Sequence, residues 1–356
     1  MSIMHFQACK SKRPTWHGVL WLTVCLAIPP WPALAQETGS EKGAASLITP
    51  ATEHAIKQGL EFLAAQQRAD GSFGSGGYRG NVAITALAGM AFLSSGSTPE
   101  RGPYGANVSR CIDYLLANTQ QSGFIVHQPT ASHGPMYGHG FATLFLAECY
   151  GMSPRPELRE KLAKAVRLIV NCQNKEGGWR YQPQRLDADI SVTVCEVMAL
   201  RAAKNAGINV PRDTVDRSIE YVKRCQNPDG GFMYTHQGGE SAFARSAAAL
   251  VALYSAGIYE GPEITKGLAY LMQFKPKRGV ARQELYYYYG HYYAIQAMWH
   301  ADRDYWPVWY PAIRDELIAR QQKDGSWIDP ISVDFATSVA LLVLQVPNNY
   351  LPIFQR

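Results

Sequence analysis

The sequence predicts an all-α protein in which six helical hairpins close into a ring, an (α/α)6 toroid with inner and outer helices. A turn motif recurs at intervals of 47 to 54 residues, and a steady period near fifty indicates a repeat architecture. Each interval holds one stretch with charge on one face and one that is apolar on nearly every face. The last apolar stretch, 339–346, is followed by no polar helix of the kind that caps an open array, which favours closure.

The recurring motif is a glutamine followed by a turn with glycine and then an aromatic residue. Its fullest copy is CQNKEGGW at 172–179, and the others are QQRADGSF at 66–73, QQSGF at 120–124, CQNPDGGF at 225–232, MQF at 272–274 and QQKDGSW at 321–327. Counted from the glutamine, the register runs 67, 121, 173, 226, 273 and 322. Asn or Asp with Gly ends a helix, the Gln amide can cap free carbonyls, and the aromatic ring packs between units. We interpret the motif as a structural turn without chemistry.

Each period divides into two helices. The outer helices are expected at 52–67, 106–120, 157–173, 212–226, 262–274 and 306–322. The inner helices, which carry less charge and more Ala, Leu and Tyr, are expected at 81–95, 137–151, 189–206, 240–256, 284–300 and 332–346. One repeat register throughout predicts one toroid domain, 52–356, after a linker at 36–51 rich in Gly, Ser, Ala and Glu.

Residues 1–35 are predicted to be a signal peptide. Basic side chains precede an apolar run, 18–28, that is too short to span a bilayer, and the small residues at 33–35 form a cleavage site. We expect cleavage after Ala35 and a secreted or periplasmic mature protein. The alternative is an uncleaved anchor, which the short run and the break at Pro29-Pro30 argue against.

The net charge and the cysteines limit the classes of partner and ligand that the sequence supports. Residues 1–35 hold three positive and no negative side chains, so their removal lowers the net charge from +5 to +2, too little to indicate nucleic-acid binding. No later segment has a membrane-spanning apolar run, and no metal or cofactor motif is present. Five cysteines remain whose pairing the sequence leaves open: Cys111, Cys149, Cys172, Cys195 and Cys225.

The turn pattern Gln-x-x-x-Asp/Glu-Gly-Gly/Ser-Trp/Phe resembles the repeats of the prenyltransferase and squalene–hopene cyclase superfamily. The resemblance covers roughly residues 52–346 and implies a terpenoid-cyclase-like α/α toroid. It indicates little about activity, because enzymes of different chemistry share the turn.

Asp187-Ala188-Asp189-Ile190 resembles the Asp-x-Asp-Asp motif of class II terpene cyclases, whose middle Asp protonates an alkene. Asp187 and Asp189 match the first two acidic positions, whereas Ile190 replaces the third. The resemblance implies both as candidate catalytic residues, and two carboxyls that share a proton would raise one pKa. The alternative interpretation is that Asp189 caps a helix and Asp187 is exposed.

Other polar residues lie near the expected starts of inner helices, with a hydroxyl residue often four positions later on the same face. Capping is the preferred interpretation for Asn81 and Asp334. A second segment, Tyr286 to His291, offers an aromatic wall that could stabilise a carbocation or hold a polyisoprene chain, or simply pack. We take His291 as a third candidate catalytic residue, and the candidate ligand-binding residues are His139, Thr193, Glu196, Glu240, Tyr287 and Tyr288.

Three function classes follow from these residues. The favoured class is an exported cyclase-like toroid that binds or transforms an isoprenoid or other apolar ligand in its lumen; whether it is an enzyme is left open. The second is a non-catalytic toroid that binds a lipid, peptide or glycan. The third, a zinc protein prenyltransferase, fits less well because Asp189 and Cys195 are six residues apart and do not form the Asp-x-Cys pair that the resemblance would require.

Overall fold

The computed structural model describes residues 47–130, 132–277, 286–301 and 304–355. All of them belong to one compact unit. The predicted signal peptide and most of the linker lie outside the described residues, so both remain predictions.

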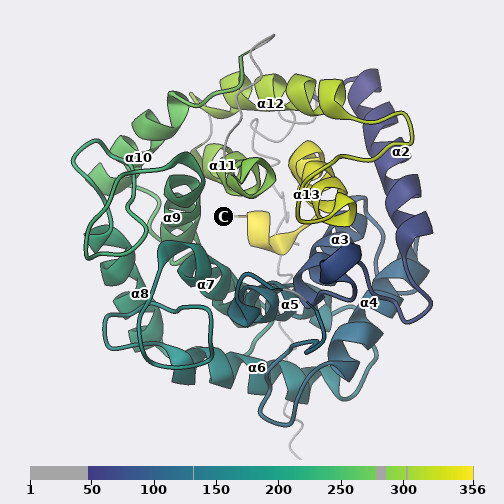
Figure 1. Cartoon of the computed structure of the whole chain (residues 1–356), viewed down its shortest axis with the longest axis horizontal. Helices are drawn as coiled ribbons and strands as arrows, with labels where there is room; N and C mark the ends of the chain where they lie inside the picture. Colours follow the sequence, from purple (N-terminus) through teal and green to yellow (C-terminus); the bar gives the residue numbers. More distant parts are fainter. Residues whose placement is uncertain (1–46, 131, 278–285, 302–303, 356) are drawn as a thin grey trace, which may run out of the picture. The chain divides into compact units, whose positions relative to one another are not determined.

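The described residues form two concentric rings of helices (Figure 1). The outer ring comprises α2 (Pro50–Gln66), α4 (Gly105–Ala117), α6 (Leu158–Cys172), α8 (Arg212–Arg224), α10 (Pro262–Met272) and α12 (Trp306–Arg320). The inner ring comprises α3 (Val82–Ser94), α5 (Pro135–Tyr150), α7 (Ile190–Asn205), α9 (Phe243–Ser255), α11 (Tyr287–Ala301) and α13 (Val333–Gln345). All twelve expected helices are present within a few residues of the predicted bounds. The largest differences are three residues: α9 begins at Phe243 rather than 240 because Ala242 before it is extended, α11 begins at Tyr287 rather than 284, and α4 ends at Ala117 rather than 120.

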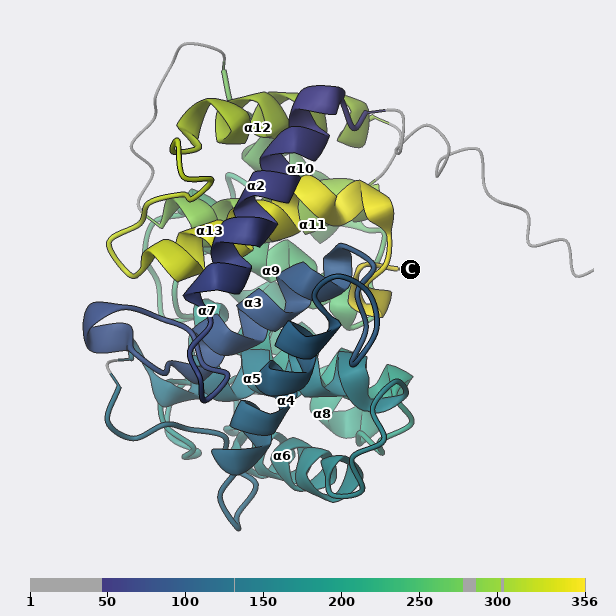
Figure 2. The ribbon, with the colours of Figure 1, turned by 90° about the vertical axis from the view of Figure 1, so that its right-hand side faces the viewer.

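The ring closes as the repeat pattern predicts. The last inner helix, α13, packs against the first, α3, and against the first outer helix, α2; α2 and α4 cover this side of the inner ring in Figure 2. Asp334 contributes to the closure, because its Oδ2 accepts a hydrogen bond from Gly74 N–H at 2.7 Å. The expectation that Asp334 caps its own helix is therefore wrong, since Ser332 caps α13, whereas Asn81 does cap α3.

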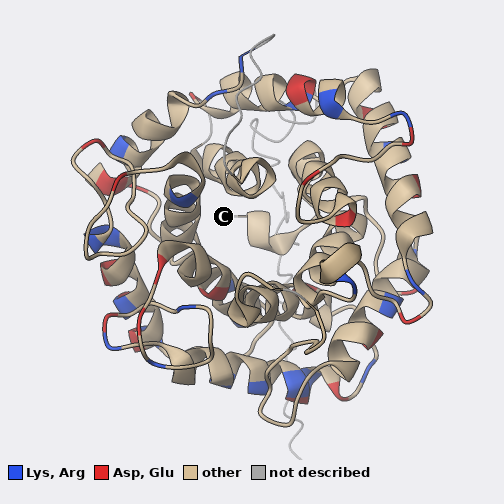
Figure 3. Ribbon diagram, in the orientation of Figure 1, with Lys and Arg blue, Asp and Glu red and all other residues tan. Residues whose placement is uncertain are grey.

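Inner and outer helices differ in burial as their sequences predict. Twelve of the thirteen residues of α3 are buried, whereas only four of the thirteen residues of α8 are. Lys, Arg, Asp and Glu accordingly gather on the outer helices and the loops (Figure 3). Burial of these apolar helices between the outer ring and the lumen supplies the hydrophobic stabilisation of the fold.

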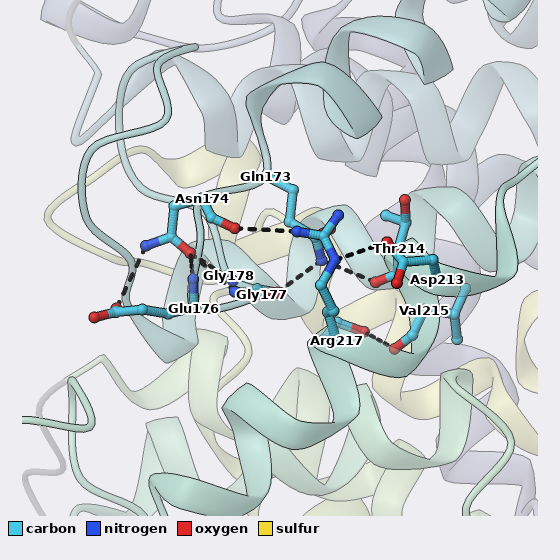
Figure 4. Close-up of polar contacts among 10 residues, drawn as sticks. Gln173, Asn174, Glu176, Gly177, Gly178, Asp213, Thr214, Val215 and Arg217 are labelled. Carbon is cyan, nitrogen blue, oxygen red and sulfur yellow. Dashed lines mark hydrogen bonds and ion pairs between the residues drawn. The ribbon is translucent and has the colours of Figure 1, made fainter.

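The turn motif joins each unit to the next outer helix. Gln173 Nε2 donates to the carbonyl of Gly177 in its own turn, at 2.9 Å, and to that of Thr214 in α8, at 2.8 Å (Figure 4). Gln67, Gln226 and Gln321 each make the same pair of bonds, to the glycine four residues on and to the next outer helix. The interpretation as a structural turn is confirmed, with one change: the glutamine caps its turn and the neighbouring unit.

These contacts correct the register in two repeats. Gln321, not Gln322, makes the two bonds, and Thr119 takes the glutamine's place four residues before Gly123. The turn glycines, Gly71, Gly123, Gly177, Gly230 and Gly325, all have φ between 87 and 100°. A Cβ on any of them would lie 2.1 to 2.6 Å from a carbonyl oxygen of the next outer helix, so glycine is required both for its φ and for the close approach.

The segment after α13 turns back into the ring. It includes two short 3-10 helices, η2 (Val346–Asn348) and η3 (Pro352–Phe354), and η3 lies inside the inner ring in Figure 1, against α7 and α11. Ile353 and Phe354 are buried there, and Trp299 Nε1 donates to Phe354 O at 3.0 Å. This segment fills the lumen near the end where the inner helices stop.

Among the described residues no helix combines the length and apolarity needed to cross a membrane. All five described cysteines are buried and unpaired with one another.

Candidate functional site

Because outer and inner helices alternate, all six inner helices begin at the same end of the ring. We call this end the mouth; it consists of the first turns of the inner helices and the loops that precede them. Along α5, α7, α9 and α13 the partly exposed residues of the first turn are Pro135, Tyr137, Ser191, Arg245 and Val333, while the next two turns are buried. The inner ring is therefore partly accessible at the mouth.

Asp189 lies at the mouth as the N-cap of α7. Its Oδ1 accepts a hydrogen bond from Val192 N–H at 2.9 Å, so the capping interpretation is confirmed. The side chain is nevertheless fully buried, and its Oδ2 makes no hydrogen bond with the described residues. Burial raises the pKa of Asp189 from 3.8 to about 6, against the opposing effects of the Val192 hydrogen bond, the Arg180 charge and the Tyr234 hydroxyl, which lies near but does not form a hydrogen bond of normal geometry.

Asp187 has a different environment. Its side chain is about half exposed, and its Oδ2 lies 2.8 Å from an Nη atom of Arg180. The same guanidinium reaches toward Asp189, with Nε 3.9 Å from Asp189 Oδ2. The raised pKa of Asp189 thus comes from burial, and the arrangement is a carboxylate–guanidinium–carboxyl series instead of two carboxyls that share one proton.

Tyrosines surround this group. The guanidinium carbon of Arg180 lies 5.0 Å from the ring centre of Tyr181 and 5.6 Å from that of Tyr234, and the two hydroxyls are hydrogen bonded to each other. Tyr137 of α5 packs on Tyr181 with ring centres 6.1 Å apart. Burial raises the pKa values of Tyr137 and Tyr289, and the charge of Asp189 adds to both shifts.

Tyrosines of α11 cross the lumen beneath the mouth. Tyr289 Oη donates to Ser191 O on α7 at 3.1 Å, and Tyr293 Oη lies 3.3 Å from Cys195 Sγ on the same helix. Tyr292 packs edge-on against Phe141 of α5, on the opposite side of the ring (Figure 1). These aromatic side chains form a floor, so a ligand at the mouth would rest on tyrosine.

His139 and Thr193, two predicted ligand-binding residues, anchor the turns. In five repeats a side chain in the first turn or two of the inner helix accepts the backbone N–H two residues after the turn glycine: Thr85, His139, Thr193, Ser246 and Thr337. The second ring nitrogen of His139 bonds to Ala165 O at 3.2 Å. Burial lowers the pKa of His139 to about 4, so this histidine is neutral at neutral pH.

Glu196 lies one turn after Thr193 and is fully buried. Both of its carboxyl oxygens lack a hydrogen bond with the described residues, and burial raises its pKa well above the usual value. In the other five repeats the residue three positions after the anchor, or after His291 in α11, is alanine: Ala88, Ala142, Ala249, Ala294 and Ala340. Glu196 also raises the pKa of Cys172 at the end of α6, so its carboxyl lies toward the outer ring.

The remaining predicted residues lie apart from Asp189. His291 packs between the inner and outer helices. The centre of its imidazole lies 5.0 Å from the ring centre of Phe243 and 6.2 Å from that of Trp309 in α12. Tyr287 lies under Arg320 of α12, and Tyr288 packs edge-on against Tyr287. Glu240 is an exposed loop residue. Among the described residues no three His, Cys, Asp or Glu side chains gather as metal ligands would.

The structure thus adds to Asp189 four residues that the sequence pattern did not indicate: Arg180, Tyr137, Tyr181 and Tyr234. A fifth, Tyr289, belongs to the aromatic segment that the sequence did indicate. The only sequence signal was the tyrosine-rich start of α11, where Tyr289 and Tyr293 are spaced i, i+4.

Comparison with known proteins agrees with this geometry. The family model of the squalene–hopene cyclase C-terminal domain matches residues 142–316. The type II terpene cyclase MstE from Scytonema, in complex with merosterolic acid A, has a TM-score of 0.62 and 14% identity over 85% of this chain and 98% of that chain. This chain has a terpenoid-cyclase-like α/α toroid fold.

A second MstE complex, with geranylgeranyl dihydroxybenzoate, gives a TM-score of 0.60 at 12% identity, with 85% of this chain and 98% of that chain covered. An α-1,6-mannanase from Salegentibacter in complex with α-1,6-mannotriose gives a TM-score of 0.61 at 7% identity over 83% of this chain and 99% of the mannanase chain. No curated protein matches in sequence. Such identities establish the fold, and the activity has to be argued from the mouth.

Proposed function

We propose that this toroid is an exported protein that binds an isoprenoid or a similar apolar alkene at its mouth and protonates it from Asp189. The observation that carries the proposal is the environment of Asp189: a buried carboxyl whose Oδ2 makes no hydrogen bond with the described residues, beside a group of tyrosines. Protonating an alkene needs an acid held neutral in an apolar site, and burial of a carboxyl provides this.

The proposed step is an acid-catalysed isomerisation. The Asp189 carboxyl proton bonds to one alkene carbon, the π pair forms the new C–H bond, and the other carbon becomes cationic. The faces of nearby tyrosines, Tyr137 and Tyr289 among them, can stabilise that charge. A neighbouring carbon then loses a proton to water, which restores a double bond, and Asp189 regains its proton from solvent.

Two features support an apolar ligand. Two solved MstE structures of the same fold are complexes with geranylgeranyl dihydroxybenzoate and with merosterolic acid A. The mouth itself is tyrosine-rich, with a floor formed by Tyr289 and Tyr293. The residue after Asp189 is Ile190, which has no acidic group; it is buried, and its N–H donates to Tyr234 O. A single carboxyl, that of Asp189, therefore has to serve as the acid.

The export part of the proposal rests on the sequence pattern of residues 1–35. N-terminal sequencing of secreted or periplasmic protein should begin at Gln36. Mature protein that starts at Met1 in the cytosol would contradict it.

The binding proposal is tested by mass spectrometry of small molecules that co-purify with the mature protein. A bound polyisoprenoid is the expected result. The α-1,6-mannanase likeness makes a glycan the alternative ligand, and a co-purified oligosaccharide or peptide would favour the non-catalytic binding toroid and contradict the proposal.

A further inference from the structure

We propose that Asp187 is a positioning residue whose carboxylate holds the Arg180 guanidinium away from Asp189, so that Asp189 can keep its proton. The purpose of this arrangement rests on the proposed function, but the arrangement itself exists without a ligand. The proposal gives the two aspartates different roles.

The distances show which carboxylate binds the guanidinium. Asp187 Oδ2 lies 2.8 Å from an Nη atom of Arg180, a close ion pair, whereas Asp189 Oδ2 lies 3.9 Å from Nε. A separation of 3.9 Å is too long for a hydrogen bond. Arg180 is therefore close enough to reach Asp189 but is bound to Asp187.

The rings of two tyrosines fix the guanidinium from the other side. Arg180 lies over both Tyr181 and Tyr234, which come from different loops and are hydrogen bonded to each other. With the guanidinium packed on these two rings, the Asp187 carboxylate determines how far it reaches toward the buried Asp189.

Loss of Asp187 would change the ionisation of Asp189. A guanidinium that forms a close pair with a buried carboxylate lowers the carboxyl pKa by about 1 to 3 units. Removing the Asp187 charge acts in the same direction, because a nearby negative charge disfavours ionisation of its neighbour. Both effects predict that Asp189 loses its proton at lower pH when Asp187 is neutral.

The other titratable groups near Asp189 do not compete for Arg180 at neutral pH. They are thiols and phenols whose pKa values burial raises, so all are neutral: Tyr137 on α5, Cys195 on α7, Tyr221 and Cys225 at α8, Tyr234 in the α8–α9 loop, and Tyr289 on α11. Arg180 and Asp187 are the charged pair that acts on this carboxyl.

The test is the pKa of Asp189, measured by carboxyl ¹³C NMR on ligand-free protein labelled at aspartate, with Asp189→Asn to assign the signal. Asp187→Asn should lower this pKa by about 1 unit or more, and adding Arg180→Gln should return it to the wild-type value or above. An unchanged or raised pKa in Asp187→Asn would overturn the proposal.

Asp213→Asn serves as the matched control. Asp213 is an exposed aspartate on α8 whose carboxylate lies 2.9 Å from Arg217 Nε, and its loss should leave the Asp189 pKa unchanged. A lowered pKa together with no turnover of any alkene would keep this inference and reject the proposed function, whereas turnover with an unchanged pKa would do the reverse.

Discussion

Tyr293 of α11 and Cys195 of α7 meet across the lumen, with the phenol oxygen and the sulfur 3.3 Å apart. The two helices are not neighbours in the ring, because α9 lies between them (Figure 1). Both side chains are buried. The contact therefore braces the inner ring internally and closes the lumen one turn below the mouth.

Replacing Tyr293 separates packing from hydrogen bonding. Tyr293→Ala should lower the free energy of unfolding by about 3 to 5 kcal/mol, because it removes a fully buried ring. Tyr293→Phe keeps the ring and should cost only about 1 kcal/mol. Denaturant unfolding followed by circular dichroism measures both. Equal losses for the two variants would contradict the view that the ring supplies most of the stabilisation.

The turn glycines should not tolerate a side chain. Gly177→Ala would place Cβ 2.1 Å from Arg217 O at a φ of 100°, so the turn or α8 has to move and we expect a loss well above about 2 kcal/mol. Gly207 also has a positive φ, 79°, but a Cβ added there would have nothing within 4 Å of it. Gly207→Ala should therefore cost only about 1 to 2 kcal/mol. The melting temperatures of the two variants measure this difference, and equal losses in both would contradict the prediction.

Adjacent glutamines in the last repeat provide a test of the turn contacts. Gln321→Ala removes the donor that bonds to Ala55 O and Gly325 O and should cost about 1 to 3 kcal/mol, since two carbonyls lose their partner. Gln322 is exposed, so Gln322→Ala should change stability by less than about 0.5 kcal/mol. Both losses are measured by chemical unfolding. A larger loss for Gln322→Ala than for Gln321→Ala would instead support the register expected from the sequence, with Gln322 as the turn glutamine.

Asp189 should make stability depend on pH. The unfolded carboxyl loses its proton near pH 3.8 and the folded one near pH 6, so between these values the folded state holds the extra proton. The contribution of this group to folding is complete below pH 3.8 and is lost as pH rises through 6. The free energy of unfolding of wild type minus that of Asp189→Asn, measured with urea from about pH 4 to 7, should decline in this way.

Asp189→Ala separates the cap from the charge. Asn caps a helix nearly as well as Asp, whereas Ala should cost about 1 kcal/mol at every pH through loss of the Val192 bond. A pH-independent difference between wild type and Asp189→Asn would show that the carboxyl pKa is not raised.

The repeat architecture could be predicted because it depends on local signals. Helix bounds and ring closure follow from periodic burial and from glycines that end helices, and both were predicted. The register failed where the motif varies: Gln321 and Gln322 are adjacent, and Ile125 occupies the aromatic position although Phe124 precedes it. Which residue bonds is decided by the neighbouring helix, which no local pattern reveals.

The site was only partly predictable for a related reason. Asp189 could be selected because it begins a helix after the best turn, and its resemblance to a cyclase motif marked it. Arg180, Tyr181 and Tyr234 lie in loops, whose conformation has no period, and they meet only through the folded ring. His139 occupies the repeat position where Thr85 and Ser246 hold the turn, but an imidazole among hydroxyl residues conceals this equivalence in the sequence.

Proton transfer from Asp189 to carbon is the central claim, and deuterium labelling tests it most directly. Purified mature protein is incubated in D2O with squalene and, separately, with a polyprenol, and the extracted lipid is analysed by mass spectrometry. Exchangeable carboxyl protons become deuterons in D2O, so wild type should place deuterium on carbon, most rapidly below pH 6 where Asp189 is protonated, and Asp189→Asn should not. Equal deuterium in both proteins, or none with either lipid, would contradict the account.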